Sequence, residues 1–157
     1  MSPPPVVHDV RSDNTEALLA AAGGRPLDVL VNNAARGAPR SELGSIDPDG
    51  ILNSVDVNMA GLLRLVQALL PNLLAASDPI IMNVTSRLGS VSAQARGDYG
   101  GLSTSYAYKV SKAAQNMLTP SPAKDLQGQV RCLAVHLGKL ATGQAASCRC
   151  QVAPGPS

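Results

Sequence analysis

The sequence contains no phenylalanine and no tryptophan, and tyrosine occurs only three times in 157 residues. We therefore expect a hydrophobic core built from Leu, Val, Ile and Ala. Three cysteines are too few for a disulfide framework, and Cys148 and Cys150 lack the second ligand pair of a zinc site, so no metal is predicted. The 13 basic and 11 acidic residues are scattered, without the basic stripe typical of nucleic-acid binding.

No segment of the sequence has the pattern of a targeting or membrane-spanning segment. Met1–Pro5 lacks the basic and apolar regions of a signal peptide. The Leu-rich run at residues 62–76 is interrupted by Arg64 and Pro71 and is too short to cross a bilayer. With a length that suits one domain, the chain is predicted to be a cytoplasmic protein that does not bind membranes.

Short apolar runs alternate with helical patterns along the chain. Strands are expected at residues 6–8, 27–31, 80–84 and 130–135, helices at 15–22, 51–76 and 104–118, and loops at 36–50 and 90–104. Pro120 is expected to end the last helix near Leu118, with Ser121 as cap of a further helix. This alternation predicts an α/β domain over residues 1–142, with a parallel sheet and helices on both faces. Residues 143–157 lack periodicity and are predicted to be a disordered tail.

Polar residues follow the predicted strands at the points where the strands end. Asp9 follows the first strand, Asn32 and Asn33 the second, Ser86 the third, and residues 138–142 the fourth. In parallel sheets, ligands bind beyond the carboxyl ends of the strands. The sequence therefore predicts a binding site at this edge.

The helix at residues 104–118 carries one tyrosine that has a lysine four residues later, Tyr108 with Lys112. Residues four apart share a helix face, so the phenol and the ammonium project side by side. A nearby cation favours the phenolate, which suits a Tyr that exchanges a proton with a substrate oxygen. The same spacing also occurs on ordinary amphipathic helices, so the pair alone leaves both interpretations open.

Five short segments occur in an order that resembles the short-chain dehydrogenase/reductase family, and in particular its carbonyl-reductase and C-factor-like branch. The resemblance covers roughly residues 6–142. Taken singly each segment is weakly specific, but the ordered set is specific. The matching pieces are Asp9–Val10, Asn32–Ala35, Asn58, Ser86 and Tyr108–Lys112.

The resemblance implies an NAD(P)-dependent oxidoreductase that acts on a small-molecule carbonyl or alcohol. Tyr108 would donate a proton to the substrate oxygen, or remove one from an alcohol. Lys112 would assist Tyr108 and bind the nicotinamide ribose. Ser86 would hold the substrate oxygen, and Asn58 would anchor a water that links Lys112 to solvent.

The same resemblance implies a set of cofactor contacts. Asp9 and Val10 would lie against the adenine, while Asn33 and Ala34 would line the cofactor floor. NADP(H) is favoured over NAD(H) on the resemblance to the branch alone. The residues implied to bind cofactor are Asp9, Val10, Asn33, Ala34, Tyr108, Lys112, Gly138 and Thr142.

The sequence also departs from the family's pattern. The phosphate-binding loop Thr-Gly-x-x-x-Gly-x-Gly is expected before Asp9, but no glycine precedes that residue. The expected fold is thus a Rossmann-like sheet without its first two strands and its final strand, with an exposed edge beside residues 27–31. These departures favour a second hypothesis, a catalytically inactive, truncated relative that binds a homologue or acts in signalling. Homo-oligomers or hetero-association are expected through helices 58–76 and 104–118.

Overall fold

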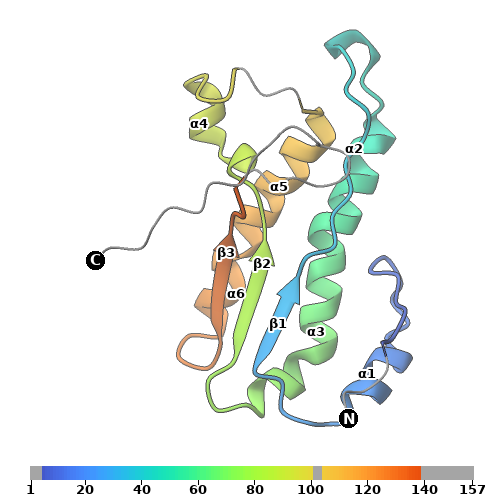
Figure 1. The fold of residues 1–157 in the computed structure, drawn as a ribbon, viewed down its shortest axis with the longest axis vertical. Helices are drawn as coiled ribbons and strands as arrows, with labels where there is room; N and C mark the ends of the chain where they lie inside the picture. The colour runs from blue at the N-terminus through green and yellow to red at the C-terminus, as the bar shows by residue number, and fades with distance from the viewer. Residues whose placement is uncertain (1–4, 101–103, 139–157) are drawn as a thin grey trace.

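The structure, a computed structural model, describes residues 5–100 and 104–138. Its centre is a parallel sheet of three strands in the order β1-β2-β3, formed by β1 (Val29–Asn32), β2 (Ile80–Val84) and β3 (Arg131–Val135). Leu30 lies beside Ile81, which in turn lies beside Cys132. The predicted parallel α/β sheet is confirmed (Figure 1). The domain boundary predicted at residue 142 lies outside the described residues.

A continuous helical segment runs alongside the sheet from Pro48 to Leu74. It consists of α2 (Pro48–Val55), one π-helical turn η2 (Asp56–Ala60) and α3 (Gly61–Leu74). The side chain of Asp47 caps its start by accepting from two backbone N–H groups, each at 3.0 Å. The segment begins three residues before the predicted position, so part of the loop predicted at 36–50 is helical, including η1 (Leu43–Ser45).

With 27 residues, this segment is long and apolar enough to cross a membrane by length and composition alone. It is therefore longer than the run of residues 62–76 on which the sequence expectation rested. Helices that cover the core of a soluble protein pass the same test. Here Leu62, Val66 and Leu73 are at most 5% exposed and pack against the sheet, which accounts for the apolar face.

The described core lies on one face of the sheet. The inward face of the strands presents Leu30, Ile81 and Cys132 to α3, α5 (Tyr106–Leu118) and α6 (Pro120–Asp125). Because alternate residues of a strand point to opposite faces, all three helices cover the same face. In Figure 1 the strands lie in front of these helices.

The opposite face of the sheet is apolar and open. Val29, Val31 and Leu133 are 45%, 52% and 41% exposed, and aliphatic side chains fill most of this face in register. Parallel sheets are ordinarily covered on both faces. The expectation of helices on both faces is thus met on one face only within the described part of the chain. The open-face residues are Val29, Val31, Ile80, Met82, Val84, Arg131, Leu133 and Val135, of which only Arg131 is charged.

Three local predictions are wrong. Residues 6–8 form no strand, and Val7 is 98% exposed, because no described strand lies beside them to pair their backbone. Part of the loop predicted at 90–104 is α4 (Val91–Ala95), whose start is capped by the Ser90 hydroxyl. The helix after Leu118 begins at Pro120 rather than after Ser121, since proline needs no N–H partner in a first turn.

The first described helix, α1 (Glu16–Ala22), matches its prediction at residues 15–22. It ends at Gly23, whose φ of 59° is the left-handed conformation that glycine adopts without steric cost. This helix packs against α3, at the edge of the molecule (Figure 1).

Candidate active site

The helix α5 brings the predicted Tyr108 and Lys112 together. Its start is capped by Ser105, whose hydroxyl accepts a hydrogen bond from the Tyr108 N–H at 3.3 Å. The ammonium nitrogen of Lys112 lies 5.8 Å from the centroid of the Tyr108 ring. The two side chains therefore share one helix face, as their spacing predicts.

Lys112 is the largest fully buried side chain of the described residues, with 1% of its surface exposed. Its ammonium donates to the backbone oxygen of Val84 at 2.9 Å and to the side-chain oxygen of Gln115 at 2.7 Å. Burial lowers the pKa of Lys112 from its usual 10.5 to about 8. Neutral oxygens thus hold this cation at the carboxyl end of β2.

Ser86 lies two residues after β2 and is the N-cap of the short helix η3 (Arg87–Gly89). Its hydroxyl accepts from the Leu88 N–H at 3.2 Å. A Cβ at Gly89 would lie 2.5 Å from the backbone carbonyl carbon of Lys112, so only glycine lets η3 rest directly on α5. The turn that carries Ser86 is therefore packed onto the helix that carries the Tyr–Lys pair.

Asn58 lies in the π-helical turn η2 and is 1% exposed. Its oxygen accepts from the Arg36 N–H at 2.6 Å, and its amide nitrogen donates to the Arg36 carbonyl at 2.7 Å and to the Ser111 hydroxyl at 2.8 Å. Both N–H groups of the amide are used by these bonds. Asn58 therefore joins the loop after β1 to α5, one residue from Lys112.

Three of the residues predicted to bind cofactor line one cavity of about 170 Å³ at the carboxyl end of β1. These are Val10, Asn33 and Ala34. Apolar side chains from η2 and α3 form much of the remaining wall. Val10 reaches this position because Gly61 leaves space for it; a Cβ at Gly61 would lie 2.9 Å from the Val10 side chain.

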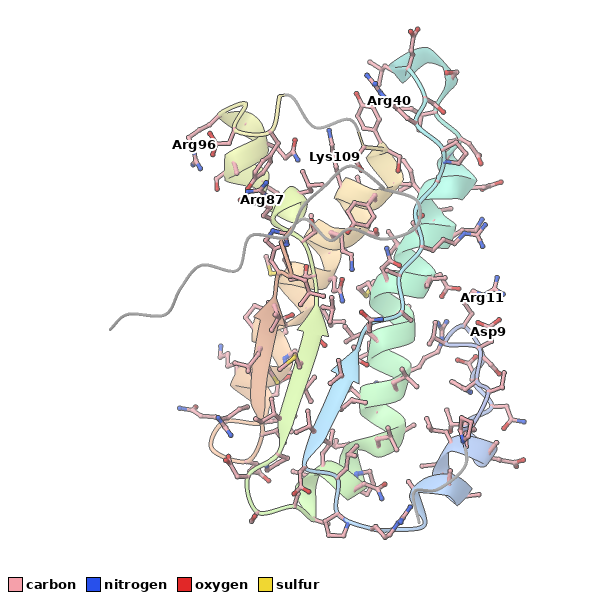
Figure 2. The ribbon with its side chains drawn as sticks, in the orientation of Figure 1. Asp9, Arg11, Arg40, Arg87, Arg96 and Lys109 are labelled. Atoms are coloured by element: carbon pink, nitrogen blue, oxygen red, sulfur yellow. The ribbon has the colours of Figure 1, made fainter. Side chains whose placement is uncertain are left out.

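Asp9 does not line this cavity. It is exposed, and the neighbouring Arg11 binds it through its backbone N–H at 3.0 Å and its guanidinium at 2.7 Å. The side-chain hydrogen bond from Arg11 is the main reason that the pKa of Asp9 falls to about 2. Figure 2 shows the two side chains pointing toward one another, to the right of the long helix.

Of the remaining predicted contacts, Gly138 is exposed after β3, and Thr142 lies outside the described residues.

A buried polar network behind the Tyr–Lys pair was not predicted from the sequence. Asn32 donates to Asn83 at 2.9 Å, and Asn83 donates to the Thr119 hydroxyl at 3.0 Å. Thr119 in turn donates to the backbone oxygen of Gln115 at 3.1 Å. The available signal was an asparagine at the end of one otherwise apolar strand and another within the next, at positions that the register places side by side.

A larger cavity of about 720 Å³ lies on another side of α5. Its lining includes Tyr106 and Lys109 of that helix, together with Arg40, but not Tyr108. Figure 2 shows Arg40 and Lys109 near the end of α5 that lies away from the strands.

Among the described residues, no group of three His, Cys, Asp or Glu side chains is placed to hold a metal ion.

The model of the short chain dehydrogenase family matches residues 5–152. Since this match spans most of the sequence, the chain belongs to the short-chain dehydrogenase family. The family assignment made from the five ordered segments is thereby confirmed.

Individual relatives agree with this assignment. C-signal of Myxococcus xanthus is 37% identical over 102 residues, which cover 65% of this chain and 58% of that protein. The carbonyl reductase Sniffer of D. melanogaster superposes with a TM-score of 0.77 at 25% identity, covering 90% of this chain and 62% of that structure. NADPH-bound carbonyl reductase from chicken fatty liver gives a TM-score of 0.68 at 27% identity, covering 81% and 54%. The chain thus spans about half the length of its relatives.

Proposed function

We propose that this protein is an NAD(P)H-dependent oxidoreductase that reduces a small-molecule carbonyl, or oxidises the corresponding alcohol, with Tyr108 as the proton donor. The observation that carries the proposal is the buried Lys112 ammonium, 5.8 Å from the Tyr108 ring centroid, on a helix against which the Ser86 turn is packed. A proton donor, a cation and a hydroxyl on adjoining elements suit acid–base chemistry at one oxygen.

The residues of the cavity at the end of β1 fit part of a dinucleotide. Asn32 is 5% exposed, lines this cavity, and has a buried side-chain oxygen with no hydrogen-bond partner in the described structure. An unpartnered acceptor among aliphatic side chains suits a flat heterocycle that bears an N–H donor. Val10, Asn33 and Ala34 would hold the adenine end, while Lys112 would bind the nicotinamide ribose. A Gly-rich pyrophosphate loop is not part of this sequence.

A nicotinamide cofactor bound there would supply the hydride for the carbonyl carbon. Tyr108 Oη gives its proton to the carbonyl oxygen as that oxygen gains negative charge, which completes the alcohol. The cation of Lys112 stabilises the phenolate left behind, and solvent returns the proton. Ser86 Oγ would hold the carbonyl oxygen toward Tyr108. Asn58 fixes the loop after β1 against α5, and its side-chain oxygen, which can accept a second hydrogen bond, would anchor a water.

Two measurements test this proposal. Millimolar NADPH is expected to raise the thermal midpoint, because a ligand present at a hundredfold excess over its Kd adds about 2.7 kcal/mol of stability. NADPH oxidation with a panel of aldehydes and quinones is expected to fall at least about 100-fold in Tyr108→Phe. Tyr106→Phe is the matched control, since this exposed tyrosine of α5 has no lysine four residues later.

A second candidate function, binding of a homologous protein without catalysis, is favoured by the open sheet face. Exposed Val29, Val31 and Leu133 provide an apolar surface for a partner. Three results would support this candidate over the first: a thermal midpoint unchanged by NADPH, no turnover, and stable co-purification with a full-length short-chain dehydrogenase.

A further inference from the structure

Gln115 is buried beside the proposed catalytic pair, although the proposed chemistry assigns it no task. It is 1% exposed and lies three residues after Lys112 on α5. Its side-chain oxygen makes the shorter of the two hydrogen bonds to the Lys112 ammonium, 2.7 Å against 2.9 Å to the Val84 backbone. The oxygen of this fully buried amide accepts a hydrogen bond from a cation. Such a charge-assisted bond holds the side chain in place more strongly than packing alone.

No described carboxylate competes for the cation. The elements packed against α5 carry Asp56 on η2, which pairs with Arg64, and Arg87 on η3, whose guanidinium lies over the Tyr99 ring. The remaining charged groups on these elements, Asp49, Lys124 and Asp125, are exposed. The titratable group in contact with Lys112 is therefore Tyr108 itself.

We propose that Gln115 is a positioning residue whose side-chain oxygen holds the Lys112 ammonium in place beside Tyr108. This inference rests on the proposed function, in which the same ammonium acts on the phenol and the ribose. Two of the three ammonium protons are occupied by Gln115 and Val84, which leaves one for the ligand. Without Gln115, the flexible four-carbon stem would be fixed by a single backbone acceptor.

The buried amide network reaches the backbone of Gln115. Its backbone oxygen accepts from Thr119, which is linked through Asn83 to Asn32. Gln115 and Asn32 also line the same cavity at the end of β1. A ligand in that cavity therefore touches the residue that holds the catalytic cation, so cofactor binding and Lys112 position are coupled through Gln115.

The test is an NMR titration of Lys112 in protein labelled at lysine Cε and Nζ. The chain has four lysines, so Lys112→Arg assigns the signal. Gln115→Leu removes the acceptor and is expected to lower the pKa of Lys112 by about one pH unit or more. Gln115→Glu replaces the neutral acceptor with a carboxylate and is expected to raise the pKa of Lys112 by a similar amount or more. Gln67→Leu, an exposed glutamine on α3, is the control and should leave it unchanged.

A lower pKa of Lys112 in Gln115→Leu and a higher one in Gln115→Glu support the positioning role. A merely structural loss would shift the pKa in the same direction in both variants. Unchanged titration in Gln115→Glu, or a downward shift in both, overturns it. If Gln115→Leu does not fold, Gln115→Met provides the acceptor-free variant. The titration needs no turnover, so an inactive protein refutes the proposed function without deciding this point. Where turnover occurs, the pH profile of kcat/KM should move with Lys112.

Discussion

The side-chain amide of Asn58 binds both backbone polar groups of Arg36, accepting from its N–H at 2.6 Å and donating to its carbonyl at 2.7 Å. This pair of bonds mimics strand pairing and fixes a loop that has no regular structure of its own. Through its third bond, to Ser111, the same amide ties that loop to α5. One buried side chain therefore holds the loop after β1 against the helix that carries the Tyr–Lys pair.

Asn58→Ala is expected to lower the free energy of unfolding by about 2–3 kcal/mol, because three hydrogen bonds to a buried amide are lost. Urea unfolding measures this change. Asn53→Ala, at an exposed position of the same helical segment, is the control and should change stability by less than about 0.5 kcal/mol. Equal effects of the two substitutions would mean that the Arg36 loop does not depend on Asn58.

Gly89→Ala is expected to destabilise the protein by about 1–3 kcal/mol or more, because the added Cβ meets the backbone of Lys112 at 2.5 Å rather than a movable side chain. Separation of η3 from α5 should also move Ser86 and lower any reductase activity further than the loss of stability explains. Gly44→Ala is the control, since nothing lies within 4 Å of its Cβ position. A Gly89 variant as stable as the Gly44 variant would contradict the packing described for η3.

The sequence predicted the elements whose signal is local. The strand at residues 80–84 and the helix around Tyr108 and Lys112 follow from apolar pattern and spacing within a few residues. The strand predicted at residues 6–8 is wrong because a strand forms only beside another strand that pairs with it. The apolar pattern of residues 6–8 alone does not show whether such a partner is present. The role of Gln115 was not predicted for a related reason. It depends on the burial of this side chain and on its bond to Lys112, which also binds the Val84 backbone, and these contacts exist only in the folded chain.

Lys112 is expected to make stability rise with pH above about 8. Its folded pKa, about 8, lies below the usual 10.5, so between these values the unfolded chain binds more protons than the folded one. The cost of burying the cation is therefore fully present below pH 8 and is removed as pH rises toward 10.5. Urea midpoints at pH 7 and pH 9.5 measure this. Lys112→Met should lack this rise, while the other titrating groups remain common to both proteins; parallel pH profiles would contradict a buried, depressed lysine.

Val31→Lys is expected to reduce self-association without disturbing the core. Val31 is 52% exposed on the open sheet face, and β1 is also an edge strand of the described sheet, so its backbone and its apolar side chains both invite a partner. A charge at this position opposes both sheet stacking and edge pairing. Sedimentation velocity at several concentrations measures the change. Leu43→Lys, at a position 77% exposed on η1, tests whether added charge alone has this effect. Equal reduction in both variants would assign it to net charge, whereas reduction confined to Val31→Lys would assign it to the open face of the sheet.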